Sequence, residues 1–120
     1  MRLDKIEQDM ALGKLSDARA VDPLSTALSD VVADVRTAAA TALGTVGDIR
    51  VFDPLSAALG DAEWRVREAA VTALGMMGDV RAVDPLLAAL DDAEWSVREA
   101  AAKALDTLGN GNLISNFWVY

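Results

Sequence analysis

Three arginines at a fixed spacing are the residues best suited to bind an anion. Arg36, Arg67 and Arg98 recur at one constant interval, and each follows a valine. Guanidinium groups bind carboxylates and phosphates through paired hydrogen bonds, so one arginine per repeat could form an anion-binding ladder. Aspartates recur at the same interval, at Asp30, Asp61 and Asp92. Because repeated arginine–aspartate pairs usually have an architectural role, we predict that these arginines stabilise the fold.

A second series of aspartates precedes proline, at Asp22, Asp53 and Asp84. Paired carboxylates can perform acid–base catalysis, but an aspartate before proline is also typical of a helix N-cap, which we favour. The chain contains no histidine and no cysteine. Their absence excludes imidazole catalysis, thiol nucleophiles, disulfides and Cys/His metal sites. The acidic residues fall on repeating positions rather than in one cluster, so we expect no enzyme active site, no metal and no cofactor.

Two tryptophans are the strongest candidates for contact with a partner. Trp64 and Trp95 each precede one of the arginines by three positions, and Ala33 takes the equivalent position in the first repeat. Tryptophan is frequent at binding hot spots because its large rigid ring loses little entropy on binding. It also packs often against a neighbouring helix, so burial in the core is the alternative interpretation of both residues.

Composition and charge narrow the classes of partner. The chain has 120 residues, enough for one domain, and 19 acidic against 11 basic residues give a formal net charge of -8. A surface this acidic repels phosphate backbones, so we expect no nucleic-acid partner. No apolar run reaches the roughly 18 residues that a membrane helix needs, and the N-terminus lacks the apolar segment of a signal peptide. We expect a soluble, cytoplasmic protein with no membrane partner.

Self-similarity is the dominant feature of the sequence, and equivalent residues are separated by a step of 31 positions. The segments 48–78 and 79–109 are identical at 20 of 31 positions, and 17–47 forms a third unit in the same register. Residues 1–16 align with the second half of a unit, and residues 110–120 align with the first half. We therefore predict a single domain made of a half unit, three full units and a truncated half unit.

Each unit contains two amphipathic helical patterns. In the last full unit the first pattern spans residues 80–90 and the second spans 94–108. The first pattern places four residues on one apolar face: Val83, Leu86, Leu87 and Leu90. Pro85 falls in its first turn, Asp92 is positioned to cap the second helix, and Gly109 is a candidate C-cap. Because one helix pair cannot bury its apolar face alone, the sequence predicts an all-α, right-handed superhelical solenoid of antiparallel helical hairpins.

The repeated pattern resembles the HEAT-like repeats first named from phycobilisome lyases. It is nearly intact in Asp79-Val80-Arg81-Ala82-Val83-Asp84-Pro85-Leu86 and from Val97-Arg98-Glu99-Ala100-Ala101 to Gly109, and it covers residues 17–109. The resemblance implies that arginine–aspartate contacts join successive units and that the second helices line the concave side. Similar proteins include lyase subunits that handle bilin chromophores, metal-dependent hydroxylases and protein-binding scaffolds. The hydroxylases need His-Glu motifs, which a chain without histidine cannot supply.

A variable face of the second helices is the predicted binding surface. Positions on this face differ between units, whereas the apolar positions opposite it are kept. The predicted contact residues are Trp64, Arg65, Glu68, Thr72 and Met76 in one unit and Trp95, Ser96, Glu99 and Lys103 in the next. We therefore predict a non-catalytic scaffold that binds a protein or peptide on this face. An accessory role in a chromophore lyase is an alternative that the resemblance implies.

The residues after the last full unit predict a different kind of contact. They are strongly apolar and include Phe117, Trp118 and Tyr120. Because exposed aromatic clusters favour aggregation, we expect this segment either to fold back over the preceding unit or to join two copies of the chain. Docking of the segment in a different chain is a further alternative. A homo-oligomeric structural module, such as a homodimer joined through these residues, is therefore the alternative to the binding scaffold.

Overall fold

Stacked pairs of helices make up residues 18–109, the part of the chain that this computed structural model describes. All regular elements in this range are helical, as the sequence predicts. The predicted half unit at 1–16 and the segment 110–120, with Phe117, Trp118 and Tyr120, lie outside the described residues.

Each repeat contributes one short and one long helix. The short helices are α2 (Val21–Ala27), α4 (Phe52–Ala58) and α6 (Val83–Ala89). The long helices are α3 (Ala33–Val46), α5 (Trp64–Met77) and α7 (Trp95–Leu108). A 3-10 turn precedes each short helix, at Ala18–Ala20, Ile49–Val51 and Val80–Ala82. The helix bounds recur at the interval of the sequence repeat, so sequence and structure share one period.

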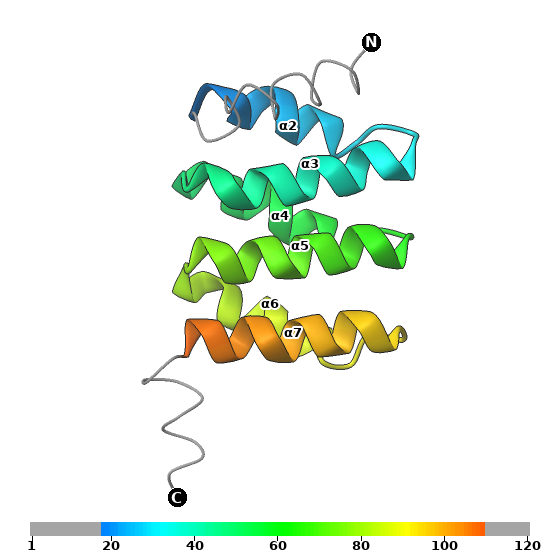
Figure 1. Cartoon of the computed structure of the whole chain (residues 1–120), viewed down its shortest axis with the longest axis vertical. Coiled ribbons are helices and arrows are strands. Elements are labelled where there is room, and N and C mark those ends of the chain that lie inside the picture. The colour runs from blue at the N-terminus through cyan, green and yellow to red at the C-terminus, as the bar shows by residue number, and fades with distance from the viewer. Residues whose placement is uncertain (1–17, 110–120) are drawn as a thin grey trace, which may run out of the picture.

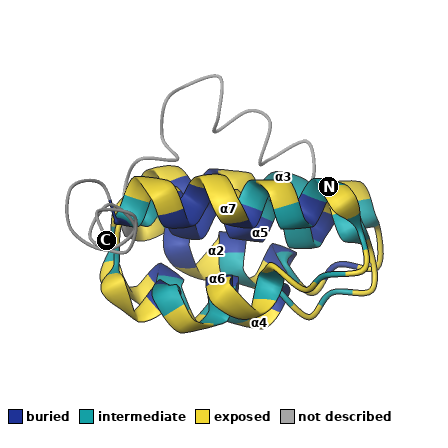
Figure 2. Ribbon diagram, turned by 90° about the horizontal axis from the view of Figure 1, so that it is seen from below, coloured by how far each residue is buried: buried dark blue, intermediate teal, exposed yellow. Residues whose placement is uncertain are grey.

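The helices form two layers. The long helices α3, α5 and α7 lie side by side in one layer, and each packs along the next (Figure 1). The short helices α2, α4 and α6 form the second layer, and the buried residues lie between the two layers (Figure 2). One face of every long helix therefore packs into the core, and the opposite face is exposed to solvent or available to a partner.

Leucines from both layers form the centre of the core. Leu24, Leu55 and Leu86 of the short helices, with Leu43 and Leu74 of the long helices, are each at most 1% exposed. Alanines of the long helices, at Ala39, Ala70 and Ala101, are fully buried. Small side chains at these positions let the long helices approach closely, so each unit completes the core of its neighbour.

The predicted N-cap role of the aspartates before proline is wrong. Asp22, Asp53 and Asp84 lie in the first turn of their short helices, not before it. The cap belongs instead to the aspartate five residues earlier: the Asp79 carboxylate accepts a hydrogen bond from the backbone N–H of Arg81. This bond caps a 3-10 turn at Val80–Ala82. The α-helix α6 therefore begins three residues later than the predicted start at residue 80.

The predicted cap at Asp92 is also corrected. Its Oδ1 accepts the backbone N–H of Glu94 at 2.8 Å, and Glu94 is the residue before α7. The carboxylate therefore closes the turn between α6 and α7 rather than capping an amide within the helix. Gly109 does lie at the C-cap of α7, as predicted.

The predicted apolar face of the last short helix is only partly buried. Leu86 is fully buried and Val83 packs against the core, but Leu87 is 46% and Leu90 36% exposed. In the preceding unit the residue equivalent to Leu90 is Leu59, which is covered by the next repeat. Leu87 and Leu90 lie on the side of the stack where the structure describes no further repeat.

Arginine clamps join successive repeats, as the resemblance to HEAT-like repeats implies. Nε and Nη2 of Arg67 donate hydrogen bonds to both carboxylate oxygens of Asp92, at 2.8 and 3.0 Å. Arg36 makes the same paired contact with Asp61, at 2.9 and 3.1 Å. The four side chains are 12–18% exposed, so these ion pairs are shielded from solvent more than surface pairs usually are.

The clamps lower the pKa of the turn aspartates. Hydrogen bonds from Arg67 hold the pKa of Asp92 below its ordinary value and outweigh the opposing effect of burial. Burial by itself would raise the pKa of Asp61, but hydrogen bonds from Arg36 and from the backbone of Glu63 reverse the sign and lower it. Each aspartate therefore stabilises the fold in its charged form.

We expect these aspartates to make the fold acid-sensitive. A lowered folded-state pKa gives stability that is complete above the ordinary aspartate value of about 3.9 and is lost as pH falls through the folded pKa. Thermal melts followed by circular dichroism should show the melting temperature falling from about pH 5 downward. Asp92→Asn should flatten this acid dependence, whereas Asp91→Asn, at an exposed neighbour in the same turn, should keep it. Equal slopes for both variants would contradict the assignment.

Candidate protein-binding surface

The outer face of α5 and α7 carries the predicted binding residues. In α5, Val66, Ala70 and Leu74 are buried, whereas Arg65, Thr72 and Met76 are exposed. Buried and exposed residues alternate along α5 because residues three or four apart lie on the same face of a helix. The face predicted from variation between units is therefore the face that the core leaves free.

A close contact between the two long helices forms the floor of this surface. A Cβ on Gly75 would lie only 2.8 Å from the Cβ and 3.0 Å from the Cα of Ala104. The glycine therefore lets α5 and α7 approach more closely than any larger residue would allow. The same relation joins α3 and α5, where a Cβ on Gly44 would lie 2.8 Å from Ala73.

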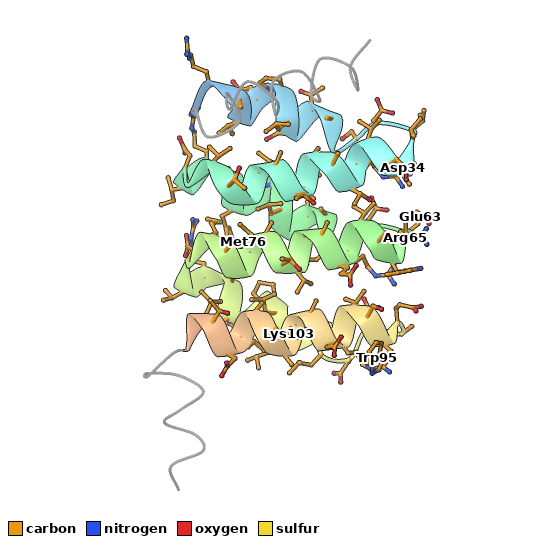
Figure 3. All side chains as sticks on the ribbon, viewed as in Figure 1. Asp34, Glu63, Arg65, Met76, Trp95 and Lys103 are labelled. Carbon is orange, nitrogen blue, oxygen red and sulfur yellow. The ribbon has the colours of Figure 1, made fainter. Side chains whose placement is uncertain are left out.

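A groove of about 370 Å³ runs above this contact, between α5 and α7. It brings together six of the nine predicted binding residues, namely Glu68, Thr72, Met76, Ser96, Glu99 and Lys103. Its remaining lining residues are Gly75, Ala100, Ala104 and Thr107. The two walls come from different repeats, so the stacking of the units creates the groove. Figure 3 shows Met76 near one end of α5 and Lys103 near the middle of α7 on the same face.

The groove presents both apolar and charged side chains. Met76 is 57% exposed and supplies an adaptable apolar surface. The carboxylates of Glu68 and Glu99 and the ammonium of Lys103 line the same groove, and none of them forms an ion pair with another described residue. Their charges are thus available to a ligand. The surface fits a peptide that presents an apolar side chain beside charged groups.

Both tryptophans and Arg65 lie outside the groove, at the N-terminal ends of α5 and α7. Figure 3 shows Arg65 and Trp95 at these ends. Trp64 is half-buried and packs against the core, with the Arg65 guanidinium 5.0 Å from the centre of its ring. Trp95 is 62% exposed. Two residues at the same position of adjacent repeats therefore have different surroundings, one supporting the fold and the other facing outward.

We expect the two tryptophans to respond differently to truncation. Trp64→Ala removes a ring that packs against the core and should lower the free energy of unfolding by about 1–3 kcal/mol. Trp95→Ala should change it by less than about 1 kcal/mol, because this residue is 62% exposed. Urea unfolding followed by circular dichroism measures both values. A larger loss for Trp95→Ala would show that its ring is packed.

Sequence reasoning missed the residues of the groove floor. Gly75, Ala100 and Ala104 carry no functional group, so their types gave no signal of binding. The recurrence of glycine at residues 44 and 75 was the available clue, because a glycine inside a helix usually has a packing reason. Thr107, the other lining residue, was not missed, because helical spacing places it on the predicted face one turn beyond Lys103.

Within residues 18–109, no group of three or more acidic residues is arranged to hold a metal ion. Over the same range, no helix combines the length and apolar character that crossing a membrane requires.

Comparison with known proteins places the repeats in a family. A family model for HEAT repeats matches residues 10–63 and residues 27–106, two overlapping matches that together span most of the chain. The match is to HEAT repeats in general and does not single out those of phycobilisome lyases. A search of curated proteins gives no match. HEAT repeats generally mediate protein–protein interaction. The chain belongs to the HEAT repeat family, as this match, the regular repeat and the paired helices together show.

Proposed function

We propose that the chain is a non-catalytic scaffold that binds a protein or peptide on the outer face of α5 and α7. The groove between these helices carries the proposal, because it collects variable residues of two repeats into one concave surface. A volume of about 370 Å³ is in the range of small ligand-binding clefts and accommodates one or two side chains of a docked polypeptide. The exposed ring of Trp95 at the end of α7 extends the same face.

Mixed charge within the groove favours a polypeptide partner over a small anion or cation. Glu68 and Glu99 attract basic side chains, and Lys103 attracts an acidic one. Met76 accepts an apolar side chain between them, and Thr72 and Ser96 add hydroxyl groups for hydrogen bonds to a peptide backbone. A single peptide can supply partners for the charged, the apolar and the hydroxyl side chains of the groove.

Site-specific photo-crosslinking tests the proposal even before the partner is identified. The full chain is prepared with p-benzoylphenylalanine at Thr72, inside the groove, and in a second sample at Asp53, an exposed residue of the short-helix layer. Irradiation in an extract of the source cells should give a discrete crosslinked protein from position 72 and not from position 53. Addition of excess unlabelled chain should suppress the product. Equal products from both positions, or none from position 72, would contradict the proposal.

Self-association through Phe117, Trp118 and Tyr120 stays a prediction from the sequence. Light scattering on the full chain and on a chain lacking residues 111–120 tests it. If the segment joins two copies, the full chain should exceed its monomer mass of 12.7 kDa and the shortened chain should return to the monomer. A full chain at 12.7 kDa over a range of concentrations would contradict the homodimer.

A further inference from the structure

We propose that the groove between α5 and α7 selects an amphipathic helix with one order of side chains. From its N-terminus, this helix presents an apolar residue, an acidic residue four positions later and a basic residue four positions after that. The inference rests on the proposed function of the groove and adds the class and the direction of the segment that it binds. The order of charges along the groove, rather than the volume of the groove, supports it.

Equivalent residues of the two repeats form three pairs across the groove. Both long helices have 14 residues and begin at the equivalent tryptophan, so residues separated by the repeat length of 31 occupy the same helical position. The contact between Gly75 and Ala104 keeps the helices in line, because residue 75 lies within two positions of the equivalent of residue 104. Successive pairs are four residues apart, which is about 6 Å along a helix axis. The pairs are Glu68 with Glu99, Thr72 with Lys103, and Met76 with Thr107.

The three pairs differ in charge, so the groove has a direction. The pair nearest the N-terminal ends of both helices holds two carboxylates, the middle pair holds the ammonium of Lys103, and the last pair holds the exposed thioether of Met76. Glu99 and Lys103 lie four residues apart on α7, yet no ion pair joins them, and Glu68 forms none with another described residue. A complementary ligand therefore presents a basic, an acidic and an apolar group along the N-to-C direction of α5 and α7.

The spacing of the pairs and the hydrogen-bonding groups of the walls favour a helical ligand. Residues four apart on one face of an α-helix are separated by about 6 Å along its axis, as the three pairs are. The walls are themselves helices, so they offer no free backbone edge to which an extended strand could pair. The Thr107 hydroxyl already donates to the carbonyl oxygen of Lys103 at 3.0 Å. The hydroxyls of Thr72 and Ser96 are too few to pair an extended backbone, whereas a helix pairs its own.

Dipoles and charge order favour a ligand helix that runs antiparallel to α5 and α7. In this direction its positive N-terminal end lies beside the negative C-terminal ends of both walls. Its acidic residue then precedes its basic residue by four positions, the order that stabilises a helix better than the reverse. The Ser96 hydroxyl, near the N-terminal end of α7, can donate to an unpaired carbonyl oxygen in the last turn of such a helix. The antiparallel direction therefore gives the order apolar, acidic, basic.

Three designed peptides of identical composition test the order. Each is a fluorescein-labelled, alanine-rich helix of about 16 residues with one leucine, one glutamate and one lysine at four-residue intervals, titrated with the full chain by fluorescence anisotropy. The order Leu–Glu–Lys should bind about fivefold or more tightly than Leu–Lys–Glu, because the latter brings a third carboxylate to the carboxylate pair and a lysine to Lys103. The order Lys–Glu–Leu reaches the same contacts only in the parallel direction and should bind about twofold or more weakly than Leu–Glu–Lys.

A charge exchange on α7 is the matched control for the peptides. Glu99→Lys combined with Lys103→Glu keeps the net charge of the chain and changes two exposed helical positions. It puts a carboxylate in the middle pair and cancels the charge of the first pair. The exchanged chain should therefore lose or reverse the preference for Leu–Glu–Lys over Leu–Lys–Glu. A circular dichroism spectrum equal to that of the wild-type chain shows that the exchange leaves the helices folded.

Equal affinities of Leu–Glu–Lys and Leu–Lys–Glu, or no binding up to about 1 mM, would overturn the proposal. A preference that survives the charge exchange would overturn it too, because the peptides would then bind elsewhere on the chain. Tighter binding of Lys–Glu–Leu would overturn the antiparallel direction. If a protein is crosslinked from position 72 but the peptides show no order, the groove binds a partner and only the helix order is wrong. If neither result is obtained, the proposed function fails as well.

Discussion

Gly75→Val should lower the free energy of unfolding by about 2–3 kcal/mol, because it forces α5 and α7 apart. Any Cβ at residue 75 would lie 2.8 Å from the Cβ of Ala104, and a Cβ is fixed to the backbone, so it cannot rotate away as the end of a long side chain can. The loss of packing outweighs the gain in helix propensity when glycine is replaced. For a domain of this size it corresponds to a fall in melting temperature of roughly 10 °C or more.

Thr72→Val is the matched control for this substitution. It introduces the same side chain one turn earlier in the same helix, at an exposed position. It should change the free energy of unfolding by no more than about 0.5 kcal/mol. Urea unfolding measures both variants. Equal stability of Gly75→Val and the wild-type chain would contradict the contact that forms the groove floor.

Arg67→Ala should be the second strongly destabilising change, with a loss of about 2–3 kcal/mol. The variant removes the paired bonds to Asp92 and the bonds from Nη1 to the carbonyl oxygens of Asp61 and Ala62. It also leaves the carboxylate of Asp92 without its guanidinium at the boundary of two repeats. Breaking one side of a shielded ion pair is more harmful than losing an exposed pair.

Arg98→Ala provides the control for the clamp. It deletes the same side chain and the same two bonds to carbonyl oxygens, but no carboxylate partner among the described residues is lost. Its destabilisation should therefore be clearly smaller than that of Arg67→Ala. The difference between the two variants isolates the contribution of the inter-repeat ion pair. Equal losses would show that the turn carbonyls, not the clamp, account for the effect.

The repeat predicted the architecture well because one physical requirement acts on every unit. A helix pair must cover its neighbour, so the same apolar positions recur in each unit, and the arginine that joins two units recurs with them. The start of the short helices was predicted less well. Two aspartates near the start of the last short helix can accept a backbone N–H, and only the structure shows that Asp79 rather than Asp84 does so.

The surroundings of the tryptophans could not be predicted from the repeat. Trp64 and Trp95 occupy the same position in nearly identical local sequences, yet one packs against the core and the other is 62% exposed. Local sequence fixes the direction of a side chain on a helix, but burial also depends on the neighbouring units. The groove has the same origin, because it forms where α5 of one repeat contacts α7 of the next, at Gly75 and Ala104.

The affinity of the partner for matched charge variants tests the central claim most directly. The protein crosslinked from position 72 is purified and titrated by calorimetry with the wild-type chain, with Glu99→Lys in the groove and with Asp53→Lys in the short-helix layer. Both substitutions make the same change in net charge at an exposed helical position. If the groove binds the partner, Glu99→Lys should weaken binding about tenfold or more, and Asp53→Lys should leave it within about twofold. Equal affinities for the two variants would contradict binding through the groove.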